Sequence, residues 1–269
     1  MRLALYAHYS EREGVAGYVL HYLRQLRELG FQICFISNSQ IPGEKERQLR
    51  ELCEKVIQRE NTGFDFAMWQ RALLEYEPGQ FEELLLTNSS VVGPFYPLEP
   101  LWRRAAEREC DFWGMTDSDE LVRHLQSYFV LIRRPVLRHP CFQTFWRSIL
   151  PFRDKRIVIG NYEIGLTKWL EEHGFAWSAV FPQKEIHALL LSRRTLAERL
   201  RDQLRPARLP QNTTMLLPDL LLECGMPFLK VQVLEDGGAV WARADSALRR
   251  MVTSRVPPEV LDELRTAAD

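Results

Sequence analysis

The sequence lacks several patterns that mark particular classes of protein. Its five cysteines are scattered and form no CxxC pair, so neither a zinc site with cysteine ligands nor a disulfide framework is expected. No run approaches the roughly 18 apolar residues of a membrane-spanning helix. The apolar run in the opening MRLALYAHYS is too short for a signal peptide and favours a strand. Together these absences predict a cytoplasmic protein.

The chain also lacks an excess of charge of either sign. Its 35 basic and 36 acidic side chains give a formal charge of −1, so the composition does not predict binding to nucleic acid. No GxGxxG motif follows the first expected strand, which argues against a dinucleotide cofactor. With 269 residues, of which 46% are hydrophobic, the chain suits one globular domain, alone or with a smaller appendage.

Hydrophobic periodicity predicts alternating strands and helices. Strands are expected at 2–9, 31–39, 84–90, 111–117 and 127–134, and helices at 15–30, 44–56, 100–109 and 162–173. Short connections between such elements predict an α/β domain over 1–191, with a mainly parallel sheet flanked by helices. A charged helix expected at 193–205 and a proline-containing connector then begin a small helical C-terminal appendage, 192–269, packed on this domain.

Polar residues follow three of the expected strands at their carboxyl ends. The three segments are His8–Tyr9–Ser10, Ser37–Asn38–Ser39 and Thr87–Asn88–Ser89–Ser90. In parallel α/β sheets, ligands bind in the crevice beyond these ends. Ordinary loops have the same composition, so the pattern alone leaves both interpretations open.

Two acidic residues have the positions that a nucleotide-sugar site requires. Asp65 lies between two phenylalanines in NTGFDFAMWQRALL, where it is a candidate to bind the nucleoside or ribose and equally a candidate helix N-cap. Glu163 opens the expected helix at 162–173 and is a candidate general base for an acceptor hydroxyl. A first-turn glutamate that stabilises its helix is the alternative. Asp117 and Asp119 are typical of a capped loop and are the next candidates for the base.

Six ordered segments carry a resemblance to a known family. NTGFDFAMW, LLLTNSSVVGPF, DFWGMTDS, HLQSYFVLIRR, YEIGLTKWLEEHG and NTTMLLPDLLLECGMPFLK resemble the rhamnan synthesis protein F family, from the first strand to about Lys230. The resemblance implies a glycosyltransferase of GT-A architecture that takes part in assembling a bacterial surface polysaccharide. It further implies an inverting transfer of rhamnose or a related deoxysugar from a nucleotide-sugar donor to a glycan or lipid-linked glycan, with peripheral contact at the inner face of the membrane.

Site residues follow from the same resemblance, motif by motif. The donor-binding set comprises His8, Tyr9, Asn61, Gly63, Asp65, Asn88, Ser89 and Ser90, and Glu163 is the implied base. The set implied for the acceptor or the sugar comprises Trp113, Thr116, His124, Gln126 and Ser127. Trp113 would stack on a sugar face or fill the core, and the sequence leaves both open.

One departure from the family concerns its cofactor. The family often has Asn-Asp-Ser where this chain has Asn88, Ser89 and Ser90, so the carboxylate expected to bind Mg²⁺ or Mn²⁺ is missing. Asp65 could supply the ligand, or Arg133 and Arg134 could neutralise the phosphates. The same departure favours a rival hypothesis, a catalytically silent glycan-binding or scaffold protein of an assembly complex. A nucleotide-sugar-modifying enzyme on a Rossmann-like sheet is the second rival.

Overall fold

The computed structural model describes residues 1–10, 14–195, 209–235 and 254. Its strands are β1 Arg2–His8, β2 Phe31–Ser37, β3 Lys55–Gln58, β4 Glu83–Asn88, β5 Val91–Val92, β6 Phe112–Ser118, β7 His124–Leu125, β8 Phe129–Arg133, β9 Trp177–Phe181 and β10 Leu229–Lys230. Its helices are α1 Gly17–Glu28, α2 Gly43–Leu52, α3 Phe64–Leu73, η1 Pro78–Gln80, α4 Leu98–Ala106, α5 Arg134–Arg138, α6 Pro140–Arg147, α7 Lys155–Val158, η2 Ile159–Ile164, α8 Gly165–Glu172, α9 Gln183–Ser192, α11 Thr213–Leu216, α12 Pro218–Glu223 and α13 Val231–Glu235.

The central sheet has the strand order β3-β2-β1-β4-β8-β6-β7, and β9 pairs with β6. The pairs from β3 to β4 are parallel, as is the pair of β6 with β9. Strand β8 runs antiparallel to both of its neighbours, β4 and β6. The prediction of a mainly parallel α/β sheet is therefore confirmed, with β8 reversed in its middle.

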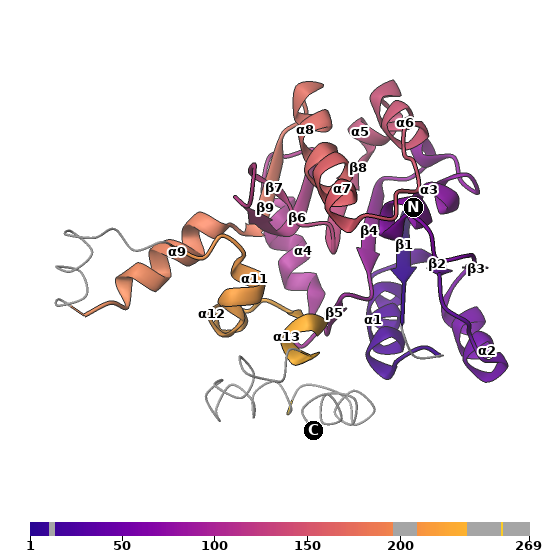
Figure 1. Ribbon diagram of the computed structural model, residues 1–269, viewed down its shortest axis with the longest axis horizontal. Helices are drawn as coiled ribbons and strands as arrows, with labels where there is room; N and C mark the ends of the chain where they lie inside the picture. The colour runs from indigo at the N-terminus through magenta and orange to yellow at the C-terminus, as the bar shows by residue number, and fades with distance from the viewer. Residues whose placement is uncertain (11–13, 196–208, 236–253, 255–269) are drawn as a thin grey trace.

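Helices cover both faces of the sheet (Figure 1). On one face, residues of α3, α5, α6 and α8 share a core with Leu3, Leu5 and Ala7 of β1. On the other face, residues of α1, α2 and α4 share a core with Ala4 and Tyr6. Successive side chains of a strand point to opposite faces, so a strand buried on both faces reads as one continuous apolar run. This explains why RLALYAH has little polar character before His8.

Several elements differ from the sequence-based expectation. The short strands β3 and β9 and the helix α9 were not expected, and the second helix ends at Leu52 rather than residue 56. The helix that carries Glu163 begins at Lys155, seven residues before the expected start. Asp154 caps it by accepting a hydrogen bond from the Arg156 amide. A π-helical stretch, η2, then joins α7 to α8, so Glu163 lies inside a long helix and not in its first turn.

The described part of the C-terminal segment packs on the main domain. Strand β10 pairs antiparallel with β5, and Leu220, Leu221 and Phe228 join the core on the α1 face. Most of the charged helix expected at 193–205 lies outside the described residues, and the boundary near residue 192 stays a prediction. Within the described ranges, no helix has the length and apolar character needed to cross a membrane.

Candidate functional site

The predicted polar segments lie side by side at the carboxyl edge of the sheet. Register places His8 opposite Ser37 and Ala7 opposite Asn88. The His8 Nδ1 atom lies 2.9 Å from Ser37 Oγ, and the ring is only 1% exposed. Burial lowers the pKa of His8 to about 4, so the ring is neutral at physiological pH. The buried His8 side chain therefore links the ends of β1 and β2, whereas Tyr9 is 47% exposed and accessible to a ligand.

A hydrogen bond joins the Asp65 segment to the end of β4. Asn88 Nδ2 donates to Asp65 Oδ2 at 2.7 Å. Asn88 Oδ1 in turn accepts from the Ser90 hydroxyl at 2.6 Å and from the Ser90 amide at 3.1 Å. Gly63 is the N-cap of α3, and no side chain caps this helix end. The N-cap interpretation of Asp65 is therefore wrong, because its carboxylate bonds to the end of β4.

Glycine is required where the loop enters α3. Gly63 has a φ of 77°, and a Cβ atom there would lie 2.6 Å from the Ala67 Cβ and 2.7 Å from the Pro151 Cα. These distances leave no room for any side chain. The neighbouring Asn61 is exposed, and its Oδ1 accepts a hydrogen bond from Asn38 Nδ2 at 3.2 Å. The loop is thus anchored to the end of β2 as well as to β4.

Ser89 fastens two strand ends together. Its hydroxyl accepts from the Tyr9 amide at 3.1 Å and donates to the Tyr9 carbonyl at 3.1 Å. The side chain is buried, so the position that matches the family's acidic residue faces the backbone of the β1 loop. This geometry does not favour the expected contact between Ser89 and the donor. Ser90 is the partly exposed serine of the pair.

Lys230 reaches the site from the C-terminal part of the chain and is absent from the residues predicted from the sequence. Its Nζ atom lies 3.3 Å from Ser90 Oγ and 4.4 Å from the centroid of the Tyr128 ring. Burial lowers its pKa to about 8, although the negative charges of Glu163 and Asp65 act in the opposite direction. The only signal in the sequence was its place at the end of the last family segment, after the apolar residues of PFLK.

The candidate base Glu163 lies at the same edge of the sheet. Its Oε1 atom accepts a hydrogen bond from the Ser127 amide at 2.8 Å. Because β8 is antiparallel to β4, the residues that precede β8 lie at the carboxyl end of β4. Burial is the main cause that raises the pKa of Asp65 to about 6, and the charge of Glu163 adds to it. Two carboxylates, Asp65 and Glu163, and two ammonium groups, Lys230 and Lys155, therefore influence one another here, an arrangement typical of functional sites.

The structure does not support a sugar contact for two of the residues implied by the resemblance. Trp113 is 1% exposed and packs edge-on against Trp102, with ring centroids 5.1 Å apart. The Thr116 hydroxyl is fully buried and bonds to Gln126 Oε1 at 2.7 Å and to the Tyr128 hydroxyl at 2.8 Å. Of the two roles that the sequence left open for Trp113, the structure supports the core, because its side chain is buried.

Of the other residues implied for the acceptor or the sugar, two are buried in the interior and one lies at the site. The His124 ring is buried, and its Nδ1 lies 2.7 Å from the Val122 carbonyl oxygen. Gln126 is buried too, and its Nε2 donates to Thr214 Oγ1 at 3.3 Å. Ser127 is partly exposed and bonds to Glu163. Of the five residues, Ser127 alone combines partial exposure with contact to the candidate base.

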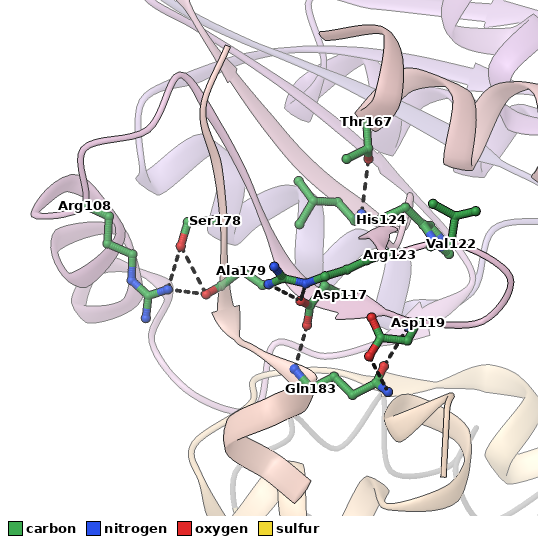
Figure 2. A network of polar contacts seen from close by, with 11 residues as sticks. Arg108, Asp117, Asp119, Val122, Arg123, His124, Thr167, Ser178, Ala179 and Gln183 are labelled. Carbon is green, nitrogen blue, oxygen red and sulfur yellow. Dashed lines mark hydrogen bonds and ion pairs between the residues drawn. The ribbon is translucent and has the colours of Figure 1, made fainter. Parts of the chain in front are cut away.

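The two alternative candidates for the base belong to a separate polar network (Figure 2). Asp117 Oδ2 accepts from Arg123 Nε at 2.9 Å and Nη2 at 2.8 Å, while Oδ1 accepts from the Gln183 amide at 2.6 Å. Gln183 Oε1 also accepts from the Asp119 amide at 2.9 Å. This network ties the end of β6 to the start of α9. Because Asp117 is buried within this network, it is poorly accessible to an acceptor hydroxyl.

Arg133 and Arg134 lie at the opposite edge of the sheet. Arg133 pairs in register with Glu83, the first residue of β4, and its guanidinium donates to the carbonyl of Cys110 at 2.7 Å. Arg134 forms an ion pair with Glu82. The expectation that these arginines could neutralise the donor phosphates is wrong, because the reversed direction of β8 carries them away from the site.

The chain belongs to the rhamnan synthesis protein F family, whose model matches residues 33–254. It is 30% identical over 170 residues to the uncharacterized protein y4gN of Sinorhizobium fredii, covering 61% of this chain and 44% of y4gN. It is 27% identical over 206 residues to the virulence protein VirA of Vibrio anguillarum, covering 71% of this chain and 66% of VirA. The chain thus spans less than two thirds of the length of both relatives.

Among solved structures, the chain is similar to the glycosyltransferase GlyE of Streptococcus pneumoniae TIGR4. The TM-score is 0.44 and the identity 13%, over 98% of this chain and 63% of GlyE. The family predicted from the six segments is therefore confirmed by the family match, independently of this structural similarity.

Proposed function

We propose that this protein is a GT-A-type glycosyltransferase that moves a sugar from a nucleotide diphosphate to a bacterial surface glycan. Rhamnose or a related deoxysugar is the proposed donor sugar, in keeping with the family's name. The observation that carries the proposal is the convergence of Asp65, Asn88 and Glu163 at the carboxyl edge of the sheet, where open α/β sheets bind ligands.

In this proposal, the residues around α3 and β4 hold the donor. Asp65 and the exposed Asn61 are available to the ribose and base, and Tyr9 lies on the same edge. Asn88 fixes the orientation of the Asp65 carboxylate through their 2.7 Å hydrogen bond. Because Asn88 itself is held by Ser90, the donor pocket is preorganised before the ligand arrives.

Glu163 is the proposed general base of a single inverting displacement. Its carboxylate removes the proton from the acceptor hydroxyl as that oxygen attacks the anomeric carbon. The bond from the anomeric carbon to the diphosphate oxygen breaks, and its electron pair leaves with the nucleoside diphosphate. The Ser127 amide holds one carboxylate oxygen at 2.8 Å, which leaves the other to receive the proton.

The acceptor is proposed to be a glycan or a lipid-linked glycan, met at the inner face of the membrane by peripheral contact in the cytoplasm. Mg²⁺ or Mn²⁺ is the cofactor that the family resemblance implies.

Binding and turnover measurements test the transferase proposal. Thermal shift and calorimetry with nucleoside diphosphates, with and without Mg²⁺ or Mn²⁺, should identify a nucleotide that binds. Release of that nucleotide from the matching nucleotide sugar, in the presence of a glycan acceptor, should then depend on Glu163. A protein that binds no nucleotide but binds glycan would instead support the silent scaffold, the alternative that the buried Ser89 favours.

A further inference from the structure

We propose that the ammonium group of Lys230 supplies the positive charge opposite the donor diphosphate, so that donor binding needs no divalent metal ion. This inference rests on the proposed function, and it assigns a binding role to a residue from the C-terminal part of the chain.

Backbone pairing fixes the position of Lys230 next to the end of β4. Lys230 is paired with Val91 in the two-stranded sheet of β10 and β5, and the Val231 amide donates to the Ser90 carbonyl at 3.0 Å. Strand β5 begins directly after Asn88–Ser90, so a displacement of β10 would have to break this ladder. The lysine side chain is therefore presented at the site by two strands and not by a loose tail.

The ammonium group keeps capacity to bind an anion. Within the described part of the chain, its hydrogen-bond partner is the Ser90 hydroxyl at 3.3 Å, and its ring contact is the face of Tyr128 at 4.4 Å. Both of these partners are neutral and leave donors of the ammonium group unused, while the carboxylates of Glu163 and Asp65 act on its charge from nearby. The Tyr128 ring is itself fixed, because its hydroxyl lies 2.8 Å from the Thr116 hydroxyl. A partly buried cation with unused donors binds a phosphate more strongly than a solvated one, since less water screens the charge.

The side chains at this edge fit a divalent cation poorly. Asp65 Oδ2 and Asn88 Oδ1 already accept hydrogen bonds, and the Ser89 hydroxyl faces the Tyr9 backbone. No group of three or more His, Cys, Asp or Glu side chains with metal-ligand geometry occurs among the described residues. A nearby ammonium group also repels a divalent ion. The replacement of the family's acidic residue by Ser89 and the presence of Lys230 thus point in the same direction.

The charge has a function in the reaction as well as in binding. When the bond between the anomeric carbon and the diphosphate oxygen breaks, negative charge grows on that oxygen. A fixed ammonium group opposite it stabilises the transition state without rearrangement of solvent.

Calorimetry on the full chain tests the inference. The nucleoside diphosphate that binds best among UDP, GDP, CDP and dTDP is titrated in EDTA and in Mg²⁺, beside the corresponding nucleoside. The wild type should bind the diphosphate in EDTA with an affinity within about threefold of that in Mg²⁺. Lys230→Met should lower the affinity for the nucleoside diphosphate by ~10- to 100-fold and the affinity for the nucleoside by less than about twofold. Lys184→Met, on the exposed first turn of α9, is the matched control and should bind like the wild type.

The outcomes separate this inference from the proposed function. Diphosphate binding that requires Mg²⁺ and is unchanged in Lys230→Met overturns the role of Lys230, while the transferase proposal stands. If no nucleoside diphosphate binds under either condition, both fail. Lys230→Gln repeats the test with a polar side chain, and the comparison of EDTA with Mg²⁺ on the wild type decides the metal question even if neither variant folds.

Discussion

Replacing Glu163 by glutamine is the sharpest perturbation that the site allows. The glutamine Oε1 can still accept the hydrogen bond from the Ser127 amide, which the glutamate accepts at 2.8 Å. The change therefore keeps shape and removes only the charge and the basicity. If Glu163 deprotonates the acceptor, turnover should fall by roughly 10²- to 10⁴-fold, while donor affinity changes little.

The structure also limits what this change can do to stability. Glu163 lies within a continuous helix that begins at Lys155, so its charge gains little from the amino end of the helix. Loss of the charge on one hydrogen bond should cost at most about 1 kcal/mol. Removal of the negative charge should also lower the pKa of Asp65 and of Lys230, since Glu163 raises both. Rates are therefore compared at neutral pH, below the pKa of about 8 for Lys230.

Initial rates, donor affinity and melting temperature measured on one preparation separate the two roles. Glu172→Gln, near the end of α8, is the matched control and should leave the rate unchanged. A Glu163→Gln variant with full transfer activity would refute the assignment of the base. Asp119, the second of the two alternative candidates, would then be next, because Asp117 is buried.

Three further substitutions test the architecture of the site. Asp65→Asn should stabilise the protein by about 1–3 kcal/mol at pH 7, because folding raises the pKa of the Asp65 carboxyl from 3.8 to about 6. The stability that protonated Asp65 contributes is complete below pH 3.8 and is lost as the pH rises through 6. Urea unfolding should show this gain shrink in acid, and a constant gain would contradict it. Ser89→Asp should cost about 1–3 kcal/mol, because the Tyr9 carbonyl loses its donor; an unchanged melting temperature would count against that brace. Gly63→Ala should cost about 2–4 kcal/mol, against about 1 kcal/mol for Gly30→Ala, which shares a positive φ but has open space around it; equal losses would show that crowding is unimportant.

Features of the site that depend on parallel strands could be predicted from the sequence. The polar residues after β1, β2 and β4 follow apolar runs, and parallel neighbours must end at the same edge. The approach of Asp65 to Asn88 follows from this rule, because α3 starts next to those strand ends. Gly63 came from the family resemblance alone, and the reason for a glycine there, the close approach of Ala67 and Pro151, required the structure.

The direction of a strand, the burial of a side chain and contacts between residues far apart in the sequence could not be predicted in the same way. The hydrophobic pattern of a strand does not depend on its direction in the sheet. The sequence therefore could not predict that β8 is antiparallel to β4, which places Arg133 away from the site. Trp113 lies on a strand buried on both faces, where alternation carries no signal. Lys230 is joined to Ser90 across 140 residues of sequence, and no local pattern reports such a contact.

Four ionisable groups, Asp65, Glu163, Lys230 and Lys155, form one electrostatic unit at the site. Asp65 and Glu163 each favour the protonated form of Lys230, and Lys230 favours the ionised form of Asp65. Burial opposes charge on both Asp65 and Lys230, so each keeps its charge partly because the other is present. Lys230 comes from the C-terminal segment and the carboxylates come from α3 and η2. The described C-terminal residues therefore complete the charge of the site, and a boundary near residue 192 would divide that site between two parts of the chain.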